Sequence, residues 1–180
     1  FGLEPNFGCC TANFNQGWPK FMLSAFMHDG NTVMSAIPIP SELKTNDFSI
    51  DLKTNYPFEN SFVYTVDAKK DITLKIRIPS FAKDIKVNGK QIAFCEELGF
   101  EIGMGESTKI TLEFTTLPEI FDRPHDLKSV RCGSLVFSLP IAFEEKRCEY
   151  ENKGIERKYP YCDYEYHPTS EWQYGYSSPF

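Results

Sequence analysis

The sequence lacks any run of about 20 consecutive apolar residues, so we expect no transmembrane helix. It also lacks a basic excess: 19 Lys and Arg face 25 Asp and Glu, and the formal net charge of -6 argues against a nucleic-acid partner. The Gly-x-Ser-x-Gly elbow, a phosphate-binding Gly-rich loop and the His-Glu-x-x-His motif are all missing. These absences exclude the commonest hydrolase, nucleotide-binding and metalloprotease signatures.

An initiator Met and a signal-peptide pattern are also missing, and the chain opens with Phe-Gly-Leu-Glu-Pro. We therefore expect it to be a piece of a longer polypeptide. Its 180 residues suffice for one substantial domain or two small ones. The six cysteines are too dispersed for a small disulfide scaffold, so we expect reduced thiols and, with them, a cytoplasmic setting. They are Cys9, Cys10, Cys95, Cys132, Cys148 and Cys162.

Cys9 and Cys10 form the most distinctive local feature. Apolar residues from Phe14 to Met27 follow them at helical spacing, which predicts one helix, kinked at Pro19 and closed by His28-Asp29-Gly30. At a helix N-terminus a thiolate is favoured, and a thiolate binds soft metals and attacks electrophiles. The alternative is that both cysteines are small buried hydrophobes. A zinc site also needs about four ligands, and this stretch offers two.

Short strands with frequent turns dominate residues 33–114. The clearest strands, with apolar and polar residues alternating, are residues 48–54 and 72–78. An Asn88-Gly89 turn predicts a hairpin over residues 85–90. Further strands are expected at residues 33–37, 62–66, 100–102 and 109–114. This pattern is typical of an antiparallel β-sandwich.

The remaining third of the chain gives weaker signals. Residues 115–126 are interpreted as a connection, residues 129–139 as a strand pair, and the charged stretch from Glu144 as a solvated surface. The tail from Tyr159 to Tyr176 is rich in aromatic residues, which either stack on sugars or pack against the protein; we favour packing. The three histidines receive no role.

Residues 6–21, which include the paired cysteines, Asn13 and the Gln-Gly-Trp-Pro-Lys-Phe segment, resemble a motif of the β-L-arabinofuranosidase family, glycoside hydrolase family 127. Leu74 to Pro79 with Val87-Asn88-Gly89 is similar to a passage of the first sandwich domain of that family. Two later segments also resemble it: residues 131–137 and the tail segment from Pro168 to Gly175. Gln16 departs from the pattern, because well-studied members have arginine there, so the sugar is left open.

The resemblance implies that the motif ends an (α/α)6-barrel catalytic domain, followed by sandwich domains. It implies that Cys9 is the nucleophile of a retaining mechanism, that Cys9 and Cys10 bind zinc, and that an upstream glutamate and cysteine complete the metal site. A carboxylic acid outside this chain would act as general acid. The expected partners are a terminal furanoside and the rest of the catalytic domain.

We therefore expect a mainly β chain with jelly-roll-like antiparallel sandwich units after one N-terminal helix. Residues 1–30 would end the barrel, residues 31–116 would form a sandwich, and residues 117–180 a second, partial unit. The fragment alone would be inactive, would bind zinc poorly or not at all, and would self-associate through its exposed helix. The alternative is a non-catalytic structural or carbohydrate-binding module.

Overall fold

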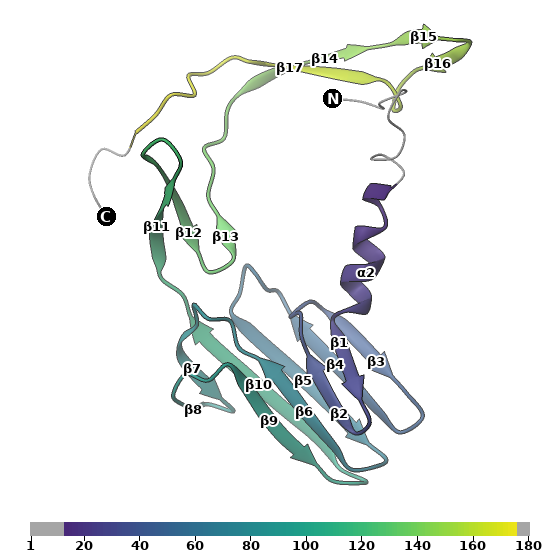
Figure 1. The fold of residues 1–180 in the computed structure, drawn as a ribbon, viewed down its shortest axis with the longest axis vertical. Coiled ribbons are helices and arrows are strands. Elements are labelled where there is room, and N and C mark those ends of the chain that lie inside the picture. The colour runs from purple at the N-terminus through teal and green to yellow at the C-terminus, as the bar shows by residue number, and fades with distance from the viewer. Residues whose placement is uncertain (1–12, 176–180) are drawn as a thin grey trace. The chain divides into compact units, whose positions relative to one another are not determined.

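The computed structural model describes residues 13–175 and is mainly β (Figure 1). It divides into two compact units. One runs from Trp18 to Val136, and the other contains the described residues before and after that range. Within the described part of the chain, no helix is long and apolar enough to cross a membrane. The predicted mainly β fold class is confirmed.

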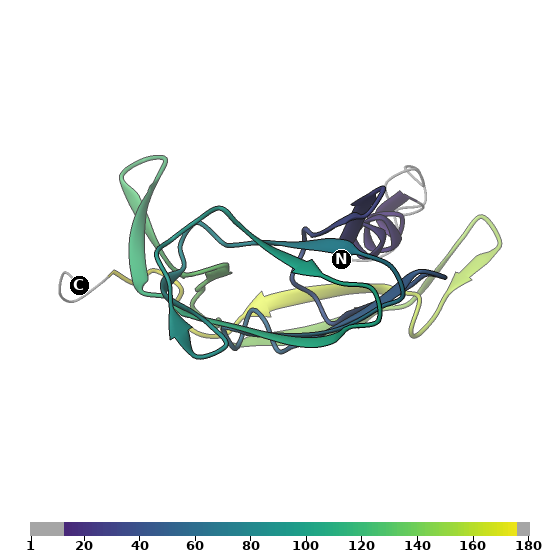
Figure 2. The same cartoon turned by 90° about the horizontal axis from the view of Figure 1, so that it is seen from below.

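Two sheets build the sandwich of the larger unit, and they form separate layers (Figure 2). The first sheet, in spatial order, contains β1 (Phe26–Asp29), β2 (Thr32–Ser35), β6 (Ile72–Arg77) and β9 (Glu97–Ile102). The second contains β3 (Ser41–Lys44), β4 (Phe48–Thr54), β5 (Ser61–Ala68), β10 (Ser107–Thr115), β7 (Lys83–Val87) and β8 (Lys90–Gln91). All neighbouring pairs are antiparallel except β2 and β6, which are parallel.

The core lies between these sheets and follows from the period of two along each strand. In β6, Ile72, Leu74 and Ile76 are buried, whereas Thr73 and Lys75 face outward. The outward residues pair with carboxylates of β9, Thr73 with Glu101 at 2.8 Å and Lys75 with Glu97 at 2.6 Å. The same alternation buries every second residue at the start of β4 and along β5. The predicted sandwich is therefore confirmed for this unit.

One polar contact crosses the apolar core. The hydroxyl groups of Ser35 on β2 and Tyr64 on β5 are 2.9 Å apart, and both residues are buried. Because each hydroxyl satisfies the other, neither polar group is left without a partner in the core. The hydrogen bond therefore fixes the first sheet against the second at a defined position.

The hairpin between β7 and β8 turns as its sequence predicts. Asn88 and Gly89 have φ values of 49° and 77°, the positive values that a two-residue hairpin turn of this type requires. The Asn88 side chain also accepts a hydrogen bond from the backbone N–H of Thr111 at 2.8 Å. The turn is thereby tied to β10.

The prediction of one helix from Phe14 to Met27 is wrong. Helix α2 runs only from Gly17 to Leu23, after a turn at residues 15–16, and residues 26–29 form strand β1. Pro19 falls in the first turn of α2, where its missing N–H costs no hydrogen bond, so it does not kink the helix. At the other end Ser24 closes the helix, because its hydroxyl and its N–H both donate to the Lys20 carbonyl. Gly30 has a φ of 58° and turns β1 into β2.

The larger unit continues beyond the sandwich. Strands β11 (Pro118–Arg123), β12 (Leu127–Cys132) and β13 (Leu135–Val136) form a three-stranded antiparallel sheet. The segment interpreted as a connection, residues 115–126, therefore contains a strand that the sequence did not predict. Mostly exposed side chains explain the missed strand, since β11 buries no face and so shows no apolar alternation.

Two small sheets make up the described strands of the other unit. β14 (Phe143–Cys148) pairs with β17 (Asp163–Pro168), and β15 (Tyr150–Asn152) pairs with β16 (Ile155–Arg157). The charged stretch from Glu144 is exposed, as expected, but it is a strand. Phe143 and Tyr166 pack edge to face across this pair, with ring centroids 5.0 Å apart. The proposed division into residues 1–30, 31–116 and 117–180 stays a prediction.

Burial raises the pKa of Tyr64 to about 12, an effect larger than the opposite one of its hydrogen bond to Ser35. In the unfolded chain the Tyr64 hydroxyl loses its proton near pH 10. Below about pH 10 the hydroxyl is protonated in both states, and between pH 10 and about 12 ionisation of the unfolded chain lowers the free energy of unfolding. We expect the free energy of unfolding to fall by about 3 kcal/mol across that range through this group. Denaturant titrations of the parent and Tyr64→Phe should show the smaller fall in the variant. Equal falls would contradict the burial argument.

The backbone at Gly133 lies close to two side chains. Its φ is 61°, and a Cβ there would lie 3.2 Å from both Phe81 and Thr116 side chains. Gly89 has a similar φ but open space around it, so Gly89→Ala should cost only about 1 kcal/mol through backbone strain. Gly133→Ala should lower the free energy of unfolding by about 1–3 kcal/mol more, because the methyl group displaces Phe81 or Thr116. Equal losses in the two variants, measured by chemical denaturation, would show that the contact yields without cost.

Candidate functional site

The predicted nucleophile and metal ligand Cys9, and the predicted metal ligand Cys10, lie outside the described residues. Their roles stay predictions. The described end of the motif is locally ordered by its own side chains: the Gln16 amide donates to the Asn13 side-chain oxygen at 2.7 Å. The Gln16 backbone N–H also donates to the Asn13 carbonyl at 3.0 Å. Gln16 is thus engaged with the motif asparagine.

Helix α2, which follows this turn, exposes its apolar stripe. No residue of the helix is buried, and Trp18, Phe21 and Met22 are all exposed. Trp18 and Phe21 contact each other edge to face with ring centroids 6.4 Å apart. The helix therefore presents an apolar face that the described residues do not cover.

No metal site is complete within residues 13–175. They contain no group of three or more His, Cys, Asp or Glu side chains able to hold a metal ion. The four described cysteines, Cys95, Cys132, Cys148 and Cys162, are free thiols.

The larger unit carries an open hollow of about 570 Å³ at one end of the sandwich. β2 and β6 are parallel and β9 is antiparallel to β6, so the ends of β2 and β6 and the start of β9 meet there. The segments that follow or precede these strands line the hollow. Its aromatic and polar lining residues are Tyr56, Arg77, Ser80, Phe81, Phe94 and Glu96.

Two of these rings are held in place by packing. The Tyr56 ring lies edge to face on Phe62, with centroids 5.5 Å apart, and its hydroxyl group hydrogen bonds to Ser134. Phe81 is half-buried, 6.5 Å from the Phe114 ring. Phe94 is exposed and projects from the segment before β9.

The two charged side chains of the first hollow have no ionic or hydrogen-bonding partner among the other described side chains. The guanidinium of Arg77 and the carboxylate of Glu96 are exposed, and neither makes an ion pair or side-chain hydrogen bond with another residue in the range 13–175. Glu96 contributes only its backbone carbonyl, which accepts from Ile78 at 2.9 Å. A donor and an acceptor of opposite charge therefore remain available at one hollow.

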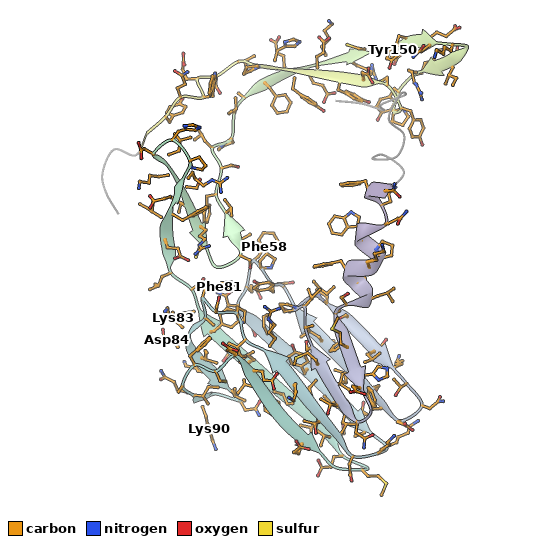
Figure 3. All side chains as sticks on the ribbon, viewed as in Figure 1. Phe58, Phe81, Lys83, Asp84, Lys90 and Tyr150 are labelled. Atoms are coloured by element: carbon orange, nitrogen blue, oxygen red, sulfur yellow. The ribbon has the colours of Figure 1, made fainter. Side chains whose placement is uncertain are left out.

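A second hollow of about 390 Å³ adjoins the first and shares Ser80 and Phe94 with it. Besides Ser80, its polar lining residues are Lys83, Asp84 and Gln91. Phe81, Lys83 and Asp84 lie at the end of the sandwich where β7 begins (Figure 3). The Asp84 carboxylate accepts a hydrogen bond from Thr115 at 2.8 Å, which fixes it on the β10 side.

Sequence reasoning missed this pair of hollows. Tyr56-Pro57 and Pro79-Ser80-Phe81 read as breaks after strands, and breaks carry no periodic signal. The available signal was an aromatic residue within two positions of a proline at each of these breaks. Only the strand order shows that they lie at the same end of the sandwich.

Comparison with known proteins addresses the family. Residues 32–100 match the family model described as Beta-L-arabinofuranosidase, GH127 middle domain. The resemblance to glycoside hydrolase family 127 is confirmed. The matched range begins at β2 and ends within β9, so the match falls inside the sandwich and leaves out β1 and β10.

Solved structures share the fold at low identity. A GH127 β-L-arabinofuranosidase from Geobacillus stearothermophilus T6 matches with 15% identity and a TM-score of 0.58, over 79% of this chain and 28% of that one. A protein described as a glycoside hydrolase matches with 14% identity and a TM-score of 0.58, over 95% of this chain and 34% of that one. A GH127 β-arabinofuranosidase matches with 15% identity and a TM-score of 0.55, over 82% and 31% of the two chains.

The chain thus spans about a third of the length of these structures. No curated protein matches it.

Proposed function

We propose that this chain is the C-terminal part of a retaining glycoside hydrolase, a β-L-arabinofuranosidase-like exo-enzyme with Cys9 as its nucleophile. The observation that carries the proposal is the order along the chain: the GH127 middle domain at residues 32–100 directly follows the paired-cysteine motif. Two independent resemblances to one family, in the family's own order, support each other. The fold likeness to GH127 structures about three times as long agrees with a larger parent protein.

The exposed stripe of α2 supports the same proposal. Trp18, Phe21 and Met22 are exposed in the described part of the chain, and a contiguous exposed apolar face of this kind marks a contact surface. A helical catalytic domain that continues upstream of Phe1 would supply that cover.

The proposed chemistry has two displacement steps at the anomeric carbon of a terminal sugar. In the first, the Cys9 thiolate forms a C–S bond while the glycosidic C–O bond breaks, and a carboxylic acid outside this chain protonates the departing oxygen. In the second, the resulting carboxylate takes a proton from water, the water oxygen bonds to the same carbon, and the C–S bond breaks. Two inversions give net retention.

Zinc belongs to the proposal, with Cys9 and Cys10 as two of its ligands. Bound there, it would keep the thiols deprotonated at neutral pH. The resemblance implies that the other ligands, a glutamate and a cysteine, are upstream of this chain. The isolated chain would then bind zinc poorly or not at all and would be inactive.

The parent protein should release a furanose from an aryl β-L-arabinofuranoside, and Cys9→Ala should reduce kcat/KM by at least about a thousandfold, because no other group replaces the nucleophile. Cys95→Ala is the matched control, since Cys95 is a free thiol of the sandwich, and it should keep near-parental activity. Full activity in a folded Cys9→Ala variant would refute the assignment. Metal analysis of the same preparations tests zinc separately.

We also expect the isolated 180-residue chain to self-associate through the α2 face. Replacing Trp18 and Phe21 with Glu should shift it to monomer in light-scattering chromatography, because both side chains are exposed and apolar. The control is Phe58→Glu, which changes an even more exposed phenylalanine elsewhere. A monomeric parent chain at high concentration, or an equal shift in the control, would contradict this expectation.

A further inference from the structure

We propose that the two adjoining hollows at the end of the sandwich form one groove that binds a neutral oligosaccharide, distinct from the chemistry assigned to Cys9. The groove is lined by residues between Ala36 and Glu96. It therefore lies wholly within the larger unit, and the proposal does not depend on the nucleophile or on zinc.

The aromatic side chains argue for a sugar. The C–H faces of a sugar ring pack on aromatic rings, and the ring hydroxyls around the edge then reach polar groups. Tyr56 and Phe81 are fixed by Phe62 and Phe114, so they lose little freedom on binding. Phe94 is 51% exposed and belongs to both hollows, where it would contact two successive sugar units.

The polar groups match hydroxyls in both directions. A guanidinium only donates hydrogen bonds and a carboxylate only accepts them, whereas a sugar hydroxyl does both. Arg77 and Glu96 have no side-chain partner within the described range, and neither does the Ser80 hydroxyl between the hollows. Each can therefore bond to a ligand without breaking an existing contact.

The charge and volume of the hollows narrow the choice of ligand further. Each hollow is lined by one basic and one acidic residue, which are Arg77 and Glu96 in the first and Lys83 and Asp84 in the second. Such balance gives no net attraction for phosphates or acidic sugars. Volumes of about 570 and 390 Å³ fall within the range of roughly 300–1,000 Å³ for small-molecule pockets. Because Ser80 and Phe94 line both hollows, a ligand of more than one sugar unit would fill them together.

The test uses the 180-residue chain with short neutral arabino-, xylo- and galacto-oligosaccharides as probes, by saturation-transfer NMR and calorimetric titration. We expect at least one neutral probe to bind and Phe94→Ala to weaken it about tenfold, since one stacked ring is lost. Arg77→Gln and Glu96→Gln should each weaken it as well. The matched control is Phe58→Ala: Phe58 is 82% exposed and lines neither hollow.

Absence of binding to every neutral probe, equal loss in Phe58→Ala, or tighter binding of an oligogalacturonate would each overturn the proposal. A signal that follows only self-association of the chain would do the same. Thermal unfolding checks that each variant keeps its fold. We expect Phe94→Ala to fold, because the Phe94 side chain is exposed. In the parent protein, Phe94→Ala should leave hydrolysis of a small aryl furanoside unchanged while Cys9→Ala abolishes it, so the two proposals fail separately.

Discussion

The structure depends on the burial of two apolar sheet faces against each other. Strands β4, β5 and β10 bring one row of side chains, β2, β6 and β9 bring the facing row, and their buried members form one cluster. A sheet exposes half of its side chains, so neither layer would be stable alone, and the interlayer contact supplies most of the stabilisation. The Ser35–Tyr64 hydrogen bond adds position to this otherwise non-directional force.

This dependence explains what the sequence could predict. Where one face of a strand is buried, apolar and polar residues must alternate, and residues 48–54 coincide with β4 for that reason. Where neither face is buried the pattern vanishes, so β11 and the strand beginning at Phe143 were not recognised. The helical stripe from Phe14 onward misled in the opposite sense: its apolar residues are exposed on α2, and its last members belong to β1.

The two candidate sites also differ in whether the sequence could predict them. The paired cysteines are a local motif, which sequence can show, although their geometry lies outside the described residues. The groove beside Phe94 is assembled from chain segments that strand order alone brings together, so no local pattern could predict it. The family match covers residues 32–100 of the sandwich, and Cys9, which we propose as the nucleophile, precedes it. In such a chain the recognisable fold and the proposed chemistry belong to different segments.

The edge strands of the two sheets affect how this chain can associate with other proteins. The outermost strands are β1 and β9 in one sheet and β3 and β8 in the other. β8 is only two residues long, and β3 and β9 carry charged side chains such as Glu42, Lys44 and Glu97. Short or charged borders make poor templates for an added strand from another molecule. Strand addition at β3, β8 and β9 is thereby disfavoured, whereas the exposed apolar side chains of α2 offer another protein surface a contact without strand pairing.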